Sequence, residues 1–92
     1  MEDRARFSRD LLATTPFREL SLQSADNMRI NSRSGIEIRG RAKDPRGKPV
    51  SLVQWVQFSG GGFIRVLGVS SPEKWDEMFN RFRAVRDGVE IR

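Results

Sequence analysis

Two short segments of the chain contain residue types that could do chemistry. One is the adjacent carboxylate pair Asp76 and Glu77, which could serve as a general acid and a general base. The other is the glycine run Gly60–Gly62 between Phe58 and Phe63, since glycine loops can cradle phosphate groups. Neighbouring residues of a helix point in different directions, so the two acids are better explained as first-turn partners of the helix dipole. A phosphate loop leads into a helix, whereas this run leads into the strand-like segment FIRVLGV, which indicates a hairpin turn.

The composition removes most other catalytic chemistry. The sequence has no histidine, cysteine or tyrosine, which excludes Ser-His and Cys-His nucleophiles as well as histidine- or thiolate-based metal sites. Asp26, Asp44 and Asp87 stand at expected turns or at a helix end, where hydrogen bonding to the backbone accounts for them. No acids cluster with the spacing of an oxygen-ligand metal loop. We therefore predict a protein that is not an enzyme, with no catalytic residue, no cofactor and no metal.

The length and charge of the chain restrict its organisation and its surroundings. The 92 residues, 37% hydrophobic and 32% charged, predict one small domain over residues 1–92. The net charge of +5 allows attraction to nucleic acid, but the basic residues are scattered among acids, as on an ordinary solvated surface. No apolar stretch is long enough to span a membrane, and the N-terminus lacks the apolar core of a signal peptide. The chain as written is expected in the cytoplasm, or in the periplasm if it is a piece of a longer exported protein.

The expected elements follow from hydrophobic periodicity and turn residues. Apolar residues at helical spacing predict helices over residues 3–13 and 72–87. Segments that alternate apolar with polar residues, or that are rich in β-branched and aromatic residues, predict strands at about 18–23, 35–44, 50–59 and 63–70. A turn is expected at Asp26–Asn27 and an extended tail at 89–92. The order αββββα predicts an α+β fold. Its antiparallel meander sheet of about four strands, with an N-terminal helix and a long C-terminal helix, would form a partial α/β/α sandwich.

The turns also predict how the strands pair. A turn at Gly60–Gly61 pairs Phe58 with Phe63 and Trp55 with Val66. A turn at the segment PRGK, residues 45–48, pairs Asp44 with Pro49 and hence Ile38 with Trp55. Together these registers place one apolar set on a single face, beneath the aromatic stripe of the C-terminal helix: Ile36, Ile38, Ala42, Val53, Trp55, Ile64 and Val66.

The opposite face of the predicted sheet is the candidate interaction surface. It combines apolar and charged side chains and is too apolar to be left in contact with water. Its candidate residues are Phe58, Phe63, Arg65, Arg39, Arg41 and Lys43. The N-terminal helix could cover part of this face, and we predict that the rest binds a protein partner or a second copy of the chain. The alternative is a nucleic acid bound by the basic row of the sheet edge, although charge on a solvated edge strand explains the same row.

A longer pattern resembles a known family. Residues 36–88 read as a strand, a turn, two hairpinned strands, a serine-containing link and a helix with aromatic residues at Trp75, Phe79 and Phe82. In these features the chain is similar to the C-terminal half, or to a minimal version, of the PsbP/Mog-like superfamily. That family includes the PsbP subunit of photosystem II, the Mog factor that binds the GTPase Ran, and uncharacterised bacterial proteins. The resemblance implies an α/β/α sandwich that binds other proteins without catalytic apparatus. It carries over no binding residue, because the matching positions are core positions.

Overall fold

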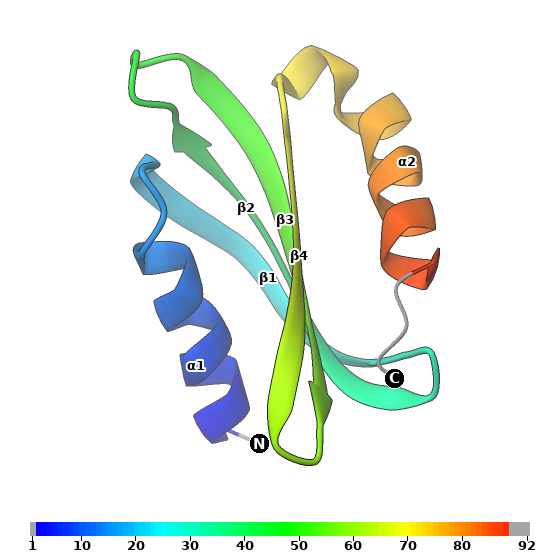
Figure 1. Cartoon of the computed structure of the whole chain (residues 1–92). Helices are drawn as coiled ribbons and strands as arrows, with labels where there is room; N and C mark the ends of the chain where they lie inside the picture. Colours follow the sequence, from blue (N-terminus) through cyan, green and yellow to red (C-terminus); the bar gives the residue numbers. More distant parts are fainter. Residues whose placement is uncertain (1, 89–92) are drawn as a thin grey trace.

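The chain folds as a helix, four strands and a second helix. The computed structural model describes residues 2–88, with these elements: α1 (Glu2–Ala13), β1 (Arg18–Ile30), β2 (Arg33–Lys43), β3 (Pro49–Ser59), β4 (Gly62–Ser70), the 3-10 helix η1 (Pro72–Lys74) and α2 (Trp75–Gly88). The strands form one antiparallel sheet in the order β1-β2-β3-β4, with a helix on each face (Figure 1). The predicted α+β meander is thereby confirmed. The extended segment expected at 89–92 lies outside the described residues.

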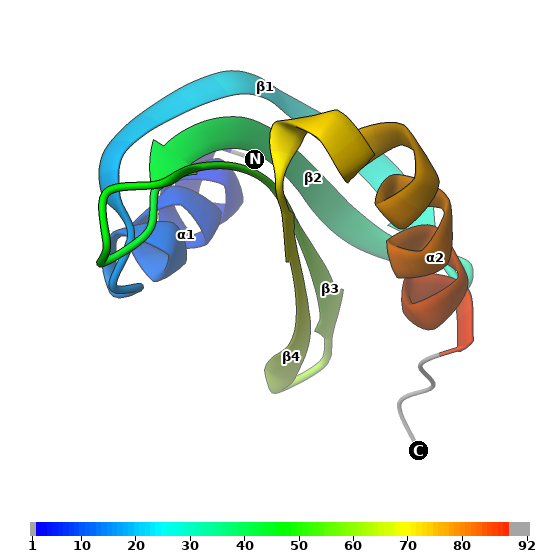
Figure 2. The ribbon, with the colours of Figure 1, turned by 90° about the horizontal axis from the view of Figure 1, so that it is seen from above.

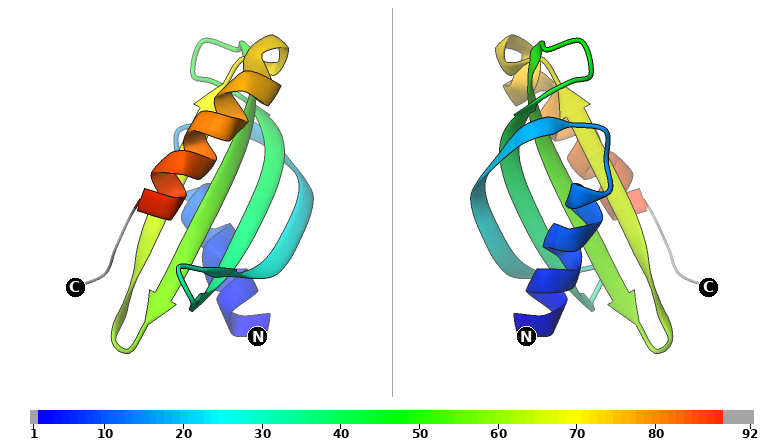
Figure 3. Two further views of the ribbon diagram at one scale, coloured as in Figure 1. Left: turned by 90° about the vertical axis from the view of Figure 1, so that its right-hand side faces the viewer. Right: turned by 90° about the vertical axis from the view of Figure 1, so that its left-hand side faces the viewer.

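The two helices cross opposite faces of a strongly curved sheet. Viewed from above, the sheet bends between them (Figure 2), and the side views show α2 lying across one face and α1 across the other (Figure 3). Side chains of β3 alternate between the two faces, with Leu52 toward α1 and both Val53 and Trp55 toward α2. Since helices cover both faces, residues 51–57 of β3 are all buried.

Each face has its own apolar cluster. On the α1 side, Leu12 of the helix packs against a buried set from β2 and β3: Ile36, Ile38, Ala42 and Leu52. On the α2 side, the aromatic stripe of the helix covers Ile30, Val53 and Trp55. The Trp55 and Phe79 rings lie 5.7 Å apart, and a methyl group on Gly68 would come within 2.4 Å of the Phe82 ring. Gly68 is therefore required by the close approach of α2 to β4.

The predicted register between β2 and β3 is wrong by one residue. The structure pairs Lys43 with Pro49, where the prediction paired Asp44 with Pro49. The cause is the loop, in which the Asp44 N–H donates to the Lys48 carbonyl and the Gly47 N–H donates to the Asp44 carbonyl, both at 2.9 Å. The bond between Asp44 and Lys48 closes the loop, so only residues 45–47 lie inside it. Gly47 takes the left-handed φ of 84° that a three-residue hairpin loop needs.

A shift of one residue exchanges the faces of a strand, and it does so here. Ile36, Ile38 and Ala42 face α1, not α2 as predicted, while Trp55 lies opposite Glu37 instead of Ile38. The register between β3 and β4 is confirmed, because Phe58 pairs with Phe63 and Trp55 pairs with Val66.

The predicted turn at Asp26–Asn27 is also wrong. Both residues lie inside β1, where Asp26 pairs with Glu37, and the chain turns at Asn31 and Ser32. These two residues have φ values of 52° and 67°, the positive pair that a two-residue type I′ turn requires. Because β1 is an edge strand and mostly exposed, it tolerates the polar residues that obscured it in the sequence.

Candidate functional site

The first candidate surface is an aromatic cluster at the end of the sheet where β3 turns into β4. Phe7 of α1 packs edge-on against Phe63, with ring centroids 4.9 Å apart, and against Phe58 at 6.2 Å. We call these three residues the aromatic end. Phe7 remains 37% exposed and Phe63 44% exposed, although both belong to regular elements. α1 therefore supplies the cover for this part of the sheet but leaves two rings in contact with solvent.

Two pockets adjoin the aromatic end and share three lining residues, Arg4, Ser34 and Phe58. The Arg4 guanidinium carbon lies 4.9 Å from the centre of the Phe58 ring, within range of a cation–π interaction. One pocket has a volume of about 280 Å³ and is completed by Asn27, Met28, Arg29, Gly35 and Ile36. The other has a volume of about 410 Å³ and is completed by Arg33, Ser59, Gly60, Gly61 and Gly62.

Arg65 lies on the same face as Phe58 and Phe63, but its guanidinium is hydrogen-bonded to groups within the protein. Its Nε donates to Gln54 Oε1 (2.7 Å), and Gln54 Nε2 donates to the Ser8 carbonyl of α1 (2.7 Å). A longer bond of 3.4 Å joins Arg65 Nη2 to the Leu11 carbonyl. Gln54 and Ser8 are fully buried, so this chain of bonds satisfies polar groups that would otherwise be costly under α1. The Arg65 guanidinium is thus committed to holding α1 on the sheet.

The basic row predicted for the same surface lies on the opposite face. Strand alternation puts Arg39, Arg41 and Lys43 on the α2 side of β2. Arg39 bonds to Glu37 and stacks over the Phe79 ring, 4.2 Å from its centre. Lys43 pairs with Glu19 at 3.0 Å. Two of the three cations therefore have carboxylate partners, and the structure separates the row from Phe58, Phe63 and Arg65.

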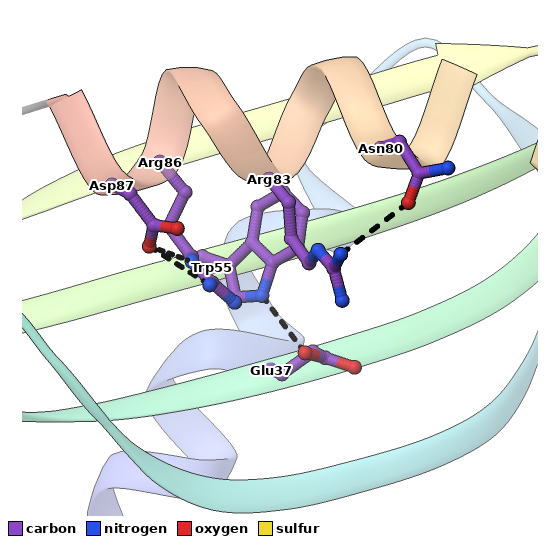
Figure 4. A network of polar contacts seen from close by, with 6 residues as sticks. All are labelled: Glu37, Trp55, Asn80, Arg83, Arg86 and Asp87. Carbon is purple, nitrogen blue, oxygen red and sulfur yellow. Dashed lines mark hydrogen bonds and ion pairs between the residues drawn. The ribbon is translucent and has the colours of Figure 1, made fainter. Parts of the chain in front are cut away.

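A polar network beneath α2 explains why Glu37 is buried. Sequence alternation placed Glu37 on the outer face of its strand, yet it is only 7% exposed because α2 covers this side. Its carboxylate accepts a bond from Trp55 Nε1 at 2.9 Å, and Figure 4 shows the indole pointing toward it. The Arg86 guanidinium lies 5.0 Å from the Trp55 ring centre and bonds to Asp87. That bond lowers the pKa of the Asp87 carboxyl below its usual value.

Three residues in or beside the aromatic end, Phe7, Arg4 and Arg33, were not predicted from the sequence as part of a binding surface. Phe7 repeats with Leu11 at helical spacing and is therefore expected on the apolar stripe of α1, but the fully buried positions of that helix are Ser8 and Leu12. Arg4 and Arg33 carry no sequence signal, since single arginines occur throughout the chain. Only the folding of α1 against the β2 and β3 ends brings them to one place.

The geometry defines a small antiparallel sheet protein with one helix per face and an aromatic, basic end. Among the side chains that the structure describes, those of residues 4–88, no three acids are grouped so that they could hold a metal ion. Neither described helix has the length and apolar character needed to cross a membrane. Comparisons with protein-family models, curated proteins and solved structures found no match to this chain. The similarity to the PsbP/Mog-like superfamily therefore stays a prediction.

Proposed function

We propose that this chain is a non-catalytic protein-interaction module that binds its partner through the aromatic end, Phe7, Phe58 and Phe63. The observation that carries the proposal is the exposure of Phe7 and Phe63 on top of a ring cluster that is itself well packed. Aromatic side chains are enriched at the centres of protein interfaces, where a few of them supply most of the binding energy. The predicted likeness to a superfamily of protein-binding sandwiches agrees with this function.

The rings belong to regular elements and contact one another, which favours binding. Phe58 and Phe63 face each other across the β3–β4 ladder, and Phe7 is fixed by a helix whose Leu12 is buried in the sheet cluster. A partner that covers these rings would not have to order them first, so little conformational entropy is lost on association. A second copy of the chain is one candidate partner for this surface. The remainder of the face is already covered by α1.

The alternative, a nucleic acid on the basic row, has weaker support from the contacts. Arg39 and Lys43 each have a carboxylate partner, so fewer cations are available for phosphate groups than the sequence suggested. Its aromatic neighbour Phe79 belongs to α2 and packs against the Trp55 cluster, so this ring offers no open face for stacking with a base. We therefore favour a protein partner.

A selection from a random peptide library, followed by titration of the enriched peptides, tests the proposal. We expect Phe63→Ser to weaken their binding by about 2 kcal/mol, roughly thirtyfold in Kd, because a central interface aromatic is lost. Val85→Ser, which alters a 57% exposed residue of α2, is the matched control and should leave binding unchanged. Peptides that bind the Phe63→Ser variant as well as the unaltered protein would contradict the proposed site. A clean monomer in sedimentation velocity at high concentration would remove the homodimer alone.

A further inference from the structure

The glycine run at the β3–β4 turn is not explained by the fold. A methyl group on Gly60, Gly61 or Gly62 would meet no atom within 4 Å, and none of the three has a φ in the left-handed region that favours glycine. Other residues would fit these positions and would restrict the unfolded chain more. Glycine is also used where another molecule's backbone or a ligand must come close to the chain. We therefore attribute Gly60–Gly62 to the close approach of another molecule.

The surroundings of the run are basic. The two pockets beside it are lined by Arg4 from α1, Arg29 from β1 and Arg33 from β2, and none of the lining residues whose side chains the structure describes is acidic. Among residues 4–88, whose side chains the structure describes, the ion pairs lie elsewhere and involve none of these arginines. Arg4 is held over Phe58, and Arg29 donates to the Ser32 carbonyl at 3.0 Å. A guanidinium group has five N–H donors, so these contacts leave Arg4 and Arg29 with donors that can bind a ligand.

We propose that this end of the sheet binds a carboxylate group of an acidic peptide segment, between Arg4 and Arg33 and against the backbone of Gly60–Gly62. The guanidinium fork matches a carboxylate with two parallel hydrogen bonds, and bare glycine backbone lets the bound chain approach closely. This inference rests on the proposed function, since the pockets share Phe58 with the aromatic end. It adds that the partner carries an acidic residue next to an apolar one.

A peptide is favoured over a nucleic acid by the distribution of charge. A phosphodiester strand needs a basic track that follows its backbone over several nucleotides. Here the arginines line two pockets at one end of the sheet, while Arg39, Arg41 and Lys43 lie further along β2 on the side that α2 covers. Phe58 lines the pocket and also belongs to the aromatic end, so the two sites are adjacent. A peptide with an acidic residue next to an apolar one can therefore occupy both.

The test is a fluorescence-anisotropy titration with two labelled peptides, one alternating glutamate and phenylalanine and the other with glutamine in place of glutamate. We expect the glutamate peptide to bind about tenfold more tightly, because charge-assisted bonds exceed neutral ones. Arg33→Glu should remove this preference. Arg46→Glu is the matched control, since it makes the same charge change at the β2–β3 loop, and it should preserve the preference. Gly61→Val should weaken binding by about tenfold without lowering Tm, because its side chain meets only the bound peptide.

The outcomes separate the two proposals. Equal binding of both peptides that is lost in Phe63→Ser would overturn the carboxylate site and leave the interaction module standing. Loss of the preference in Arg46→Glu as well as in Arg33→Glu would overturn it too, since the attraction would then depend on net charge alone. Binding of neither peptide, or tighter binding of single-stranded oligothymidylate, would equally reject the acidic-peptide site. The library selection judges the module independently.

Discussion

Glu37 shows how strongly burial changes the role of a charged residue. On a strand that alternates apolar and charged side chains, a glutamate is expected in water. In the folded chain its two oxygens have different partners, the Trp55 indole and the Arg39 guanidinium. Removing the carboxylate would therefore leave a buried donor without an acceptor, which costs more than the bond itself contributes.

Replacement of Glu37 should separate the acceptor role of this residue from its charge. We expect Glu37→Ala to lower the free energy of unfolding by about 1–3 kcal/mol, because the buried Trp55 N–H loses its acceptor. Glu37→Gln keeps an oxygen in place and should lose less. Urea unfolding of the two variants measures the difference. Equal stabilities would mean that the Trp55 bond contributes nothing.

The helix α1 depends on tertiary contact more than on its own sequence. It carries many charged residues and buries only a narrow strip, with Ser8 and Leu12 as its fully buried positions. Leu12 joins the cluster of Ile36, Ile38 and Leu52, while Gln54 binds the helix backbone at Ser8. Isolated helices of this length are marginal in water, so packing must hold α1 in place.

Truncation of Leu12 is the direct test of that dependence. We expect Leu12→Ala to cost about 2–5 kcal/mol of unfolding free energy, the range for a large side chain removed from a filled core. Leu11→Ala deletes the same atoms from a half-buried position and should cost clearly less. Chemical denaturation followed by circular dichroism gives both values. A Leu12→Ala variant as stable as Leu11→Ala would show that α1 is not docked as described.

The whole molecule contains two apolar clusters that the sheet keeps apart. Leu12 and the β2 isoleucines lie on one side, and the α2 aromatics with Trp55 lie on the other. Because side chains of the two sets point away from each other, their energies should be nearly independent. Binding at the aromatic end would then act on the α1 side without requiring a change beneath α2.

A double-mutant cycle between the two faces examines this independence. Ile38→Val on the α1 side and Phe79→Leu on the α2 side should each cost on the order of 1 kcal/mol. Their combined cost should equal the sum within about 0.5 kcal/mol, because the two side chains pack in separate clusters on opposite faces of the sheet. Thermal and urea unfolding of the four proteins supplies the cycle. A larger coupling energy would show that the sheet transmits strain between its faces.

Patterns that repeat along the chain were enough to predict the number and order of the helices and strands, the β3–β4 register and the covering of Trp55 by Phe79 and Phe82, although the first strand was predicted to end near residue 23 and runs to Ile30. These features depend on local periodicity and on one short turn, so neighbouring residues contain the information. Three features could not be predicted in this way: the β2–β3 register, the burial of Glu37, and the packing of α1 that brings Phe7 and Arg4 next to Phe58 and Gly60–Gly62. A loop that closes over three residues instead of four reverses the faces of a strand, and the choice depends on hydrogen bonds that form only when the strands have paired. The register decides which side chains each helix covers, so the candidate binding surface depends on the tertiary structure.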